Sequence, residues 1–77
     1  MGLSLYLTES QMGFAESLGF TVADSPMVGV VLTKGKRNVW PIKALWDGEW
    51  QTADLIDGHY YHHQKFKTLE AALMRPL

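Results

Sequence analysis

Two Asp-Gly pairs constrain the fold of this chain more than any other feature. They lie at Asp47-Gly48 and Asp57-Gly58, inside a stretch from 39 to 66 that is rich in Trp, Tyr, Ile, Leu, Thr and His. An Asp-Gly pair between strand-forming residues predicts a two-residue type I′ turn, because that turn needs positive φ at both central positions. We therefore predict a three-stranded antiparallel meander over this stretch.

Turns of this length also fix which residues face each other. They would place Trp40 opposite Leu55 in the first hairpin, and Leu55 opposite Tyr60 in the second. One side of the sheet, the predicted inner face, then holds Trp40, Ile42, Ala44, Ala53, Leu55, Tyr60 and Phe66. The other side, the predicted outer face, holds Val39, Pro41, Lys43, Leu45, Trp50, Thr52, Asp54, Ile56, His59, Tyr61, His63 and Lys65.

The N-terminal half predicts a strand, a helix and a second strand. Leucine alternates with other residues from 3 to 7, which indicates a short strand. A helix from about Glu9 to Leu18 is indicated by Thr8 as N-cap, by Gln11 completing a capping box, and by Gly19 after the last turn. The composition of residues 23–26 predicts a loop, and the apolar run from 27 to 33 predicts a buried strand. A turn over 34–38 would lead into the meander.

The C-terminal end predicts a second, shorter helix. Thr68 suits its N-cap and Glu70 its first turn, while Leu69, Ala72 and Leu73 form an inward stripe. The predicted order is strand, helix, four strands in a meander, and helix. This order is typical of the α+β class, with an antiparallel sheet of four to five strands and two helices packed on the inner face.

Length and composition predict one domain spanning residues 1–77. A chain of 77 residues with 47% hydrophobic content buries roughly 60 to 65% of its unfolded surface on folding. It contains no cysteine, and its first ten residues lack the basic region and long apolar run of a secretory leader. No stretch approaches the ~20 apolar residues of a membrane span. We expect a cytoplasmic protein that does not enter membranes.

Candidate chemistry is sparse in this sequence. In a strand, His59 and His63 share one side while His62 points to the other, and about 13 Å of strand separates the first two. A single metal ion would not gather them, so we predict ordinary strand histidines, no metal site and no cofactor. The serines lie where helix and loop formation account for them, and no phosphate-binding loop or nucleophile motif occurs. We expect no enzymatic activity.

The predicted outer face is the candidate interaction surface. It combines aromatic side chains with a cationic rim, and exposed patches of this kind mark interaction sites. We assign partner binding to Lys43, Trp50, Thr52, Asp54, His59, Tyr61, His63 and Lys65. Three alternative explanations of the same face are a homodimer interface, a cover supplied by the N-terminal segment, and single exposed aromatic residues without a binding role.

A basic cluster in the predicted turn, comprising Lys34, Lys36 and Arg37, is a candidate phosphate-binding set. The net charge is −1, whereas domains that bind nucleic acid mainly through phosphates usually carry a strong basic footprint. Residues 1–33 carry three acidic and no basic side chains, and residues 34–77 carry seven basic and five acidic ones. Nucleic-acid binding by the same sheet face is therefore the alternative to protein binding.

Three strands followed by Phe66, Thr68 and Ala72 leading into a helix form a layout shared with known DNA-binding domains. With Gly58 in the preceding turn, residues 39–74 resemble the sheet-plus-helix domains of plant ethylene-response factors and the arm-binding domains of tyrosine integrases. The resemblance implies a sheet that reads the DNA major groove with arginines. At the matching outward positions this chain has Lys43 and Lys65 beside Trp50, Asp54 and Tyr61.

The sequence therefore favours a small non-enzymatic protein-binding module. Such a module would act as an adaptor or inhibitor, of the compact kind that phages and mobile elements encode, through the outer face of its sheet. The expected partner is a protein, because tryptophan and tyrosine are enriched in the energetically dominant residues of protein interfaces.

Overall fold

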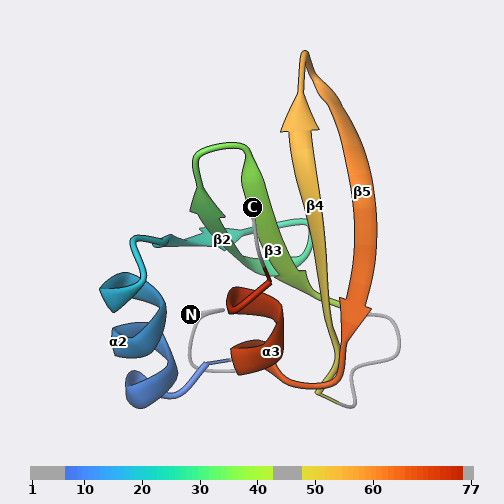
Figure 1. The fold of residues 1–77 in the computed structure, drawn as a ribbon. Helices are drawn as coiled ribbons and strands as arrows, with labels where there is room; N and C mark the ends of the chain where they lie inside the picture. Colours follow the sequence, from blue (N-terminus) through green and yellow to red (C-terminus); the bar gives the residue numbers. More distant parts are fainter. Residues whose placement is uncertain (1–6, 43–47, 76–77) are drawn as a thin grey trace.

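The computed structural model describes residues 7–42 and 48–75 of the chain (Figure 1). Along the chain come α2 (Glu9–Ser17), β1 (Thr21–Ser25), β2 (Gly29–Lys34), β3 (Arg37–Pro41), β4 (Trp50–Ile56), β5 (His59–Phe66) and α3 (Leu69–Leu73). The strands form one antiparallel sheet in the order β1-β2-β3-β4-β5. This five-stranded sheet with two helices agrees with the predicted α+β class, whereas the predicted strand over 3–7 falls mainly on residues outside the described ranges.

Both helices begin as predicted. The backbone N–H of Gln11 donates to the Thr8 hydroxyl at 3.1 Å, and the Gln11 side-chain carbonyl accepts from the Thr8 N–H at 2.9 Å. This reciprocal capping box satisfies two N–H groups that the helix itself leaves unpaired. In α3 the hydroxyl of Thr68 accepts from the N–H of Ala71 at 3.1 Å.

The end of α2 is a Schellman motif, as predicted from Gly19. The N–H of Phe20 donates to the carbonyl of Ala15, and the N–H of Gly19 donates to that of Glu16, both at 3.0 Å. Gly19 has φ +96°, a left-handed conformation that costs a residue without a Cβ little. The chain consequently reverses at once and enters β1.

The predicted loop over residues 23–26 is wrong, because most of it is strand β1. Thr21 pairs with Thr33, and the ladder continues to Ser25 opposite Gly29. Asp24 has a low strand propensity, but this edge strand leaves it exposed to solvent, so pairing with β2 outweighs the local preference. The reversal is confined to residues 26–28.

The predicted two-residue turn at Asp47-Gly48 is also wrong. The prediction paired Trp40 with Leu55, whereas Trp40 lies opposite Gln51, four residues earlier in β4. The N–H of Ile42 then donates to the carbonyl of Glu49 at 3.2 Å. This register makes the connection longer than two residues, and residues 43–47 lie outside the described ranges. The register differs from the predicted one by four residues, which is an even number. The side chains of β3 and β4 that were predicted to share a side of the sheet therefore still share one.

The second turn is confirmed. Asp57 and Gly58 have φ values of +51° and +81°, as a type I′ turn requires, and Leu55 lies opposite Tyr60. Beyond Asp54 opposite Tyr61 the register shifts by one, since the next pair is Thr52 with Gln64. The extra residue produces a β-bulge at His62, whose φ is +59°. In Figure 1 the tip of this hairpin extends beyond the end of β3.

The buried core uses the side of the sheet that the sequence predicted to be open. One hydrophobic cluster joins Leu32 on β2, Val39 on β3 and Trp50 on β4 to residues of both helices; the helix members are Ala15, Leu69, Ala72 and Leu73. Trp50 is only 2% exposed. On β3, on β4 and on β5 before the bulge, the predicted inner and outer faces are therefore interchanged: Val39, Trp50, Thr52 and Asp54 are buried, and Trp40, Leu55 and Tyr60 lie on the opposite side. Beyond the bulge Phe66 pairs with Trp50 and packs against the core, as predicted for the inner face.

The helices make separate contacts with the sheet. α2 contacts β1, while α3 contacts β4 and β5, and the two helices touch each other. The strand Arg37–Pro41 lies near the middle of the sheet and separates the two hairpins (Figure 1). On the side of the sheet that does not carry the core, β3 consequently lies between the β1–β2 hairpin and the β4–β5 hairpin.

Candidate functional site

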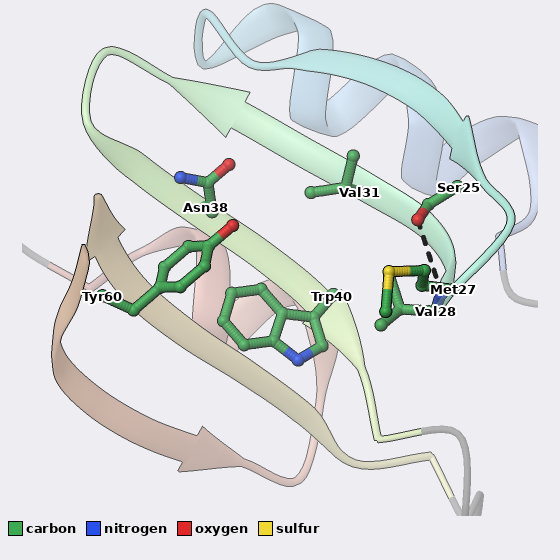
Figure 2. Close-up of a pocket in the computed structure, with 7 residues that line it drawn as sticks. All are labelled: Ser25, Met27, Val28, Val31, Asn38, Trp40 and Tyr60. Carbon is green, nitrogen blue, oxygen red and sulfur yellow. Dashed lines mark hydrogen bonds between the residues drawn. The ribbon is translucent and has the colours of Figure 1, made fainter. Parts of the chain in front are cut away.

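The candidate site is a groove on the side of the sheet opposite the core, which we call the open face. Val31 on β2, Asn38 and Trp40 on β3 and Tyr60 on β5 contribute to the groove, because strand residues alternate between the two sides. The open-face groove has a volume of about 390 Å³ and is lined by Ser25, Met27, Val28, Val31, Asn38, Trp40 and Tyr60 (Figure 2).

Two aromatic rings form the centre of the groove. Trp40 and Tyr60 meet edge to face, with ring centroids 5.5 Å apart and an interplanar angle of 63°. Between their strands lies Ala53 on β4, which is buried and too small to keep the rings apart. Edge-to-face pairs of this kind stabilise beyond the area they bury. The two side chains are thus held in place by each other and by the strands that carry them.

The β1–β2 turn forms one wall of the groove. The Ser25 hydroxyl accepts a hydrogen bond from the N–H of Val28 at 3.4 Å, drawn as a dashed line in Figure 2. This bond helps to close the turn and leaves Met27 at its tip with 84% of its surface exposed. Figure 2 shows Met27 and Val28 on the same side of the sheet as Trp40. An unbranched, apolar side chain therefore stands at the rim of the groove.

Asn38 is a polar residue on the floor of the groove, and both ends of its amide make a hydrogen bond. Its carbonyl oxygen accepts from the hydroxyl of Thr33 at 3.2 Å, and its amino group donates to the carbonyl of Lys36 at 3.2 Å. Among the seven lining residues that Figure 2 labels, none carries a charge. The groove therefore suits an uncharged apolar group.

Three residues assigned to partner binding are buried instead of exposed. Trp50, Thr52 and Asp54 lie on the core side of β4 with exposures of 2, 0 and 4%. Their burial follows from Val39 lying opposite Thr52, which places this side of β4 next to the core side of β3. An exposed aromatic face centred on Trp50 is therefore wrong, and Lys43 lies outside the described residues.

The remaining predicted residues are exposed but do not share one side. Tyr61 and His59 pair with Asp54 and Ile56, so they lie on the core side of the sheet, although their side chains are exposed. The bulge at His62 reverses the alternation, and Lys65 consequently pairs with Gln51 on the open face. The ring of His63 lies 6.4 Å from that of Tyr60. His63 and Lys65 thus lie on the open face, away from Tyr61.

Arg37 does not belong to a surface set that binds phosphates. It is 2% exposed, and its Nε donates to Asp54 Oδ1 at 2.6 Å in a buried ion pair. Lys34 lies with its Nζ 5.8 Å from the centre of the Phe20 ring, and Lys36 is exposed in the β2–β3 turn. The predicted phosphate-binding set therefore loses the residue with the best geometry for phosphate.

Arg37 and Asp54 belong to a polar network on the core side. Asp54 Oδ2 lies 2.9 Å from His62 Nδ1, and the exposed ring of His62 closes that end of the network. The hydrogen bond from Arg37 holds the pKa of the Asp54 carboxyl below its ordinary value, against the opposing effect of burial and with help from His62. At the other end, Arg75 Nη1 donates to the Thr52 hydroxyl at 2.8 Å and to the His62 carbonyl at 2.9 Å.

The network connects β3, β4 and β5 to the residue Arg75 that follows α3. His62 and Asp54 form a hydrogen-bonded dyad, and the groove lies on the opposite side of the sheet. Within residues 7–42 and 48–75 no group of three or more His, Cys, Asp or Glu side chains lies close enough together to hold a metal ion. In the same ranges no helix has the length and apolarity needed to cross a membrane.

The sequence reasoning missed the residues that line the groove. It placed Trp40 and Tyr60 correctly on one side of the sheet, but took that side for the covered one. A signal for the correct side was present in the apolar run over 27–33. Leu32 in this run pairs with Val39 on β3, and both side chains belong to the core, so the side of β3 that carries Val39 is the covered one. The sequence predicts Met27 and Val28 within that strand, whereas the structure places them in the turn over 26–28, which brings them to the groove.

Comparison with known proteins does not place this chain in a family. No family model, curated protein or solved structure matches it. The resemblance to plant ethylene-response factors and tyrosine integrases therefore rests on Gly58, Phe66, Thr68 and Ala72 alone. The side of the sheet that it would place on DNA carries the buried Trp50 and Asp54.

Proposed function

We propose that this protein is a non-enzymatic protein-binding module, and that its docking surface is the open-face groove. The observation that carries the proposal is the groove itself, with Trp40 and Tyr60 at its centre. Tyr60, Leu55 and Met27 together expose large apolar surface on this face. Patches of this kind, with aromatic anchors in a preformed hollow, are where protein interfaces concentrate binding energy.

A protein partner suits the groove better than a nucleic acid does. The lining residues are uncharged, whereas phosphate contacts supply most of the affinity of nucleic-acid-binding domains. Arg37 is occupied by Asp54 inside the protein. Inserting an apolar side chain between Met27 and Tyr60 would bury hydrophobic surface on both partners, at about 25 cal/mol for each Å².

Site-specific photocrosslinking tests the proposal. A benzophenone amino acid is introduced in place of Met27, at the rim of the groove, in the cells that produce the protein. The matched control carries it in place of Met74, which is 64% exposed and does not line the groove. We expect irradiation to give a defined protein adduct from position 27 and not from position 74, and Tyr60→Ala to reduce the yield from position 27.

The proposal fails if both positions crosslink the same proteins with equal yield. It fails equally if Tyr60→Ala leaves the adduct from position 27 unchanged while the protein keeps its native circular dichroism spectrum. Tyr60 is 49% exposed, so truncating it removes groove surface with little loss of core packing.

A further inference from the structure

We infer that the outer edge of β5 binds an extended acidic segment of another protein, which adds to the sheet as a sixth strand. This edge is a second surface, distinct from the open-face groove of the proposed function. Tyr60 belongs to both, because its ring lines the groove while its main chain lies on the edge. Three features of β5 support the inference: its position in the sheet, the direction of its main-chain groups and its charge.

β5 is the last strand of the sheet, and it is long and exposed. It pairs with β4 on one side only, and Figure 1 shows it as the outermost strand. Every residue from His59 to Lys65 is exposed, and α3 contacts the strand from the core side. The N–H and C=O groups along the edge of a sheet can pair with an extended chain, which is a common mode of peptide recognition.

The hydrogen bonds of the sheet identify two outward positions on β5. The N–H of Leu55 donates to the carbonyl of Lys36 at 2.7 Å, on the β3 side of β4. Successive pairs in an antiparallel ladder alternate between main-chain groups that face each other and groups that point apart. Leu55 with Tyr60 is therefore a pair that points apart, and Gln51 with Lys65 has the same place in the alternation. The N–H and C=O of Tyr60 and Lys65 consequently point out of the sheet, on either side of the bulge.

The charge of β5 selects an acidic strand. Residues 59–67 include Lys65 and Lys67 and no acidic side chain, and both lysines are exposed. Asp54, which pairs with β5, is buried and its charge is compensated by Arg37. Opposite charges on facing strands stabilise a sheet, whereas like charges destabilise it. An acidic segment therefore suits this edge, while β5 of a second copy would bring the same two lysines against it.

A single-stranded nucleic acid suits β5 less well than an acidic peptide does. Such strands bind by stacking successive bases on aromatic side chains that share a surface. Tyr60 and Tyr61 lie on opposite sides of the sheet, so their rings do not form one stacking surface. A peptide also offers N–H and C=O groups at the spacing of a strand edge, which a nucleic acid does not.

NMR measurement of amide exchange with water, on the full chain, tests the inference. The probe is a capped peptide of alternating glutamate and valine, and its matched control has lysine in place of every glutamate. We expect the saturating glutamate peptide to slow exchange of the Tyr60 and Lys65 amides by about tenfold or more. The amides of His59 and Tyr61, which face β4, should change little. The lysine peptide should leave all four unchanged.

A charge reversal at the edge tests the selection of an acidic partner. Lys65→Glu reverses one charge on β5, and Lys36→Glu makes the same change in the β2–β3 turn. We expect Lys65→Glu to weaken binding of the glutamate peptide by about threefold or more. Lys36→Glu should weaken it less, because this turn lies away from the β5 edge.

The inference is overturned if both peptides bind equally, if the glutamate peptide leaves the Tyr60 and Lys65 amides unchanged up to about 10 mM, or if Lys36→Glu weakens binding as much as Lys65→Glu. Oligothymidylate that slows the same amides as strongly would show a nucleic-acid site instead. Slowing that rises with protein concentration without peptide would identify a second copy as the sixth strand, which also overturns the inference. None of these results changes crosslinking from position 27, so failure of the edge and failure of the groove are distinguishable.

Discussion

At the scale of single residues, His62 decides which side chains of β5 reach the open face. Its left-handed backbone adds one residue to the strand, so His63 and Lys65 lie beside Tyr60 while Tyr61 lies on the core side. A non-glycine residue pays about 1 to 2 kcal/mol for this conformation. The ring is held by Asp54 and the carbonyl by Arg75, which offsets that cost.

Backbone strain at His62 predicts that glycine is more stable than alanine at this position, the reverse of the usual order within a strand. Both His62→Gly and His62→Ala remove the ring, but only alanine retains a Cβ in the left-handed region. We expect His62→Gly to be more stable than His62→Ala by about 1 kcal/mol in urea unfolding. The control is His63, which does not have a positive φ. There glycine should be the less stable of the two, by about 0.5 to 1 kcal/mol. Equal stability of the two His62 variants would exclude strain at the bulge.

At the scale of elements, the two glycines of the first helical segment have opposite roles. Gly13 lies inside α2, and a Cβ added there would meet nothing within 4 Å. Gly19 ends the helix with φ +96°, and a Cβ there would lie 3.4 Å from Lys34 Cε. The same residue type therefore weakens the helix at one position and terminates it at the other.

The same substitution should consequently change stability in opposite directions at these glycines. Gly13→Ala is expected to raise the free energy of unfolding by up to about 1 kcal/mol, because alanine has the highest helix propensity. Gly19→Ala is expected to lower it by about 1 kcal/mol or more, because the Schellman motif needs the left-handed conformation. Thermal and urea unfolding of the two variants measures both signs. A gain in stability for Gly19→Ala would contradict the role assigned to it.

At the scale of the whole molecule, the polar network joins parts that are distant in the chain. Asp54 on β4 is hydrogen-bonded to Arg37 on β3 and to His62 on β5. Arg75, which follows α3, donates hydrogen bonds to Thr52 and to the His62 carbonyl. Arg37 Nη1 also donates to the carbonyl of Arg75 at 3.3 Å. The segment that follows α3 is thus hydrogen-bonded to three strands, and two of its partners, Arg37 and His62, are themselves bonded to Asp54.

Acid should weaken this connection. The folded-state pKa of Asp54 lies below its unfolded value, with the hydrogen bond from Arg37 as the main cause. Its contribution to stability is therefore fully present above the unfolded pKa of about 3.9 and is lost as the pH falls through the folded pKa. We expect Asp54→Asn to lower the free energy of unfolding by about 3 kcal/mol or more at neutral pH, because it leaves Arg37 buried without a counter-charge.

The difference between the wild type and Asp54→Asn should narrow as the pH falls below about 4. Urea unfolding at a series of pH values measures that difference. Asp24→Asn on exposed β1 is the matched control, and it should change the free energy of unfolding by less than about 0.5 kcal/mol. A gap between wild type and Asp54→Asn that stays constant from neutral to acid pH would show that the carboxylate charge is not what stabilises the network.

Local signals in the sequence were sufficient where the structure depends on neighbouring residues. Thr8 with Gln11, Gly19, the turn at Asp57-Gly58 and the cap at Thr68 were all predicted, because each is decided within a few positions of the chain. The edge strand through Asp24 and the bulge at His62 were not predicted. In both, contacts with distant residues outweigh local preference: β1 pairs with β2, and His62 is held by Asp54 and Arg75.

By itself the sequence determined the capped helices, the tight turn at Gly58 and which side chains of β3 and β4 share a side. The tertiary structure alone decided which of those sides is covered. Alternation in a strand separates side chains into two sets but does not say which set meets the helices. Burial of Val39, Trp50 and the Arg37–Asp54 pair decided that choice, and it left Trp40 and Tyr60 to form the groove.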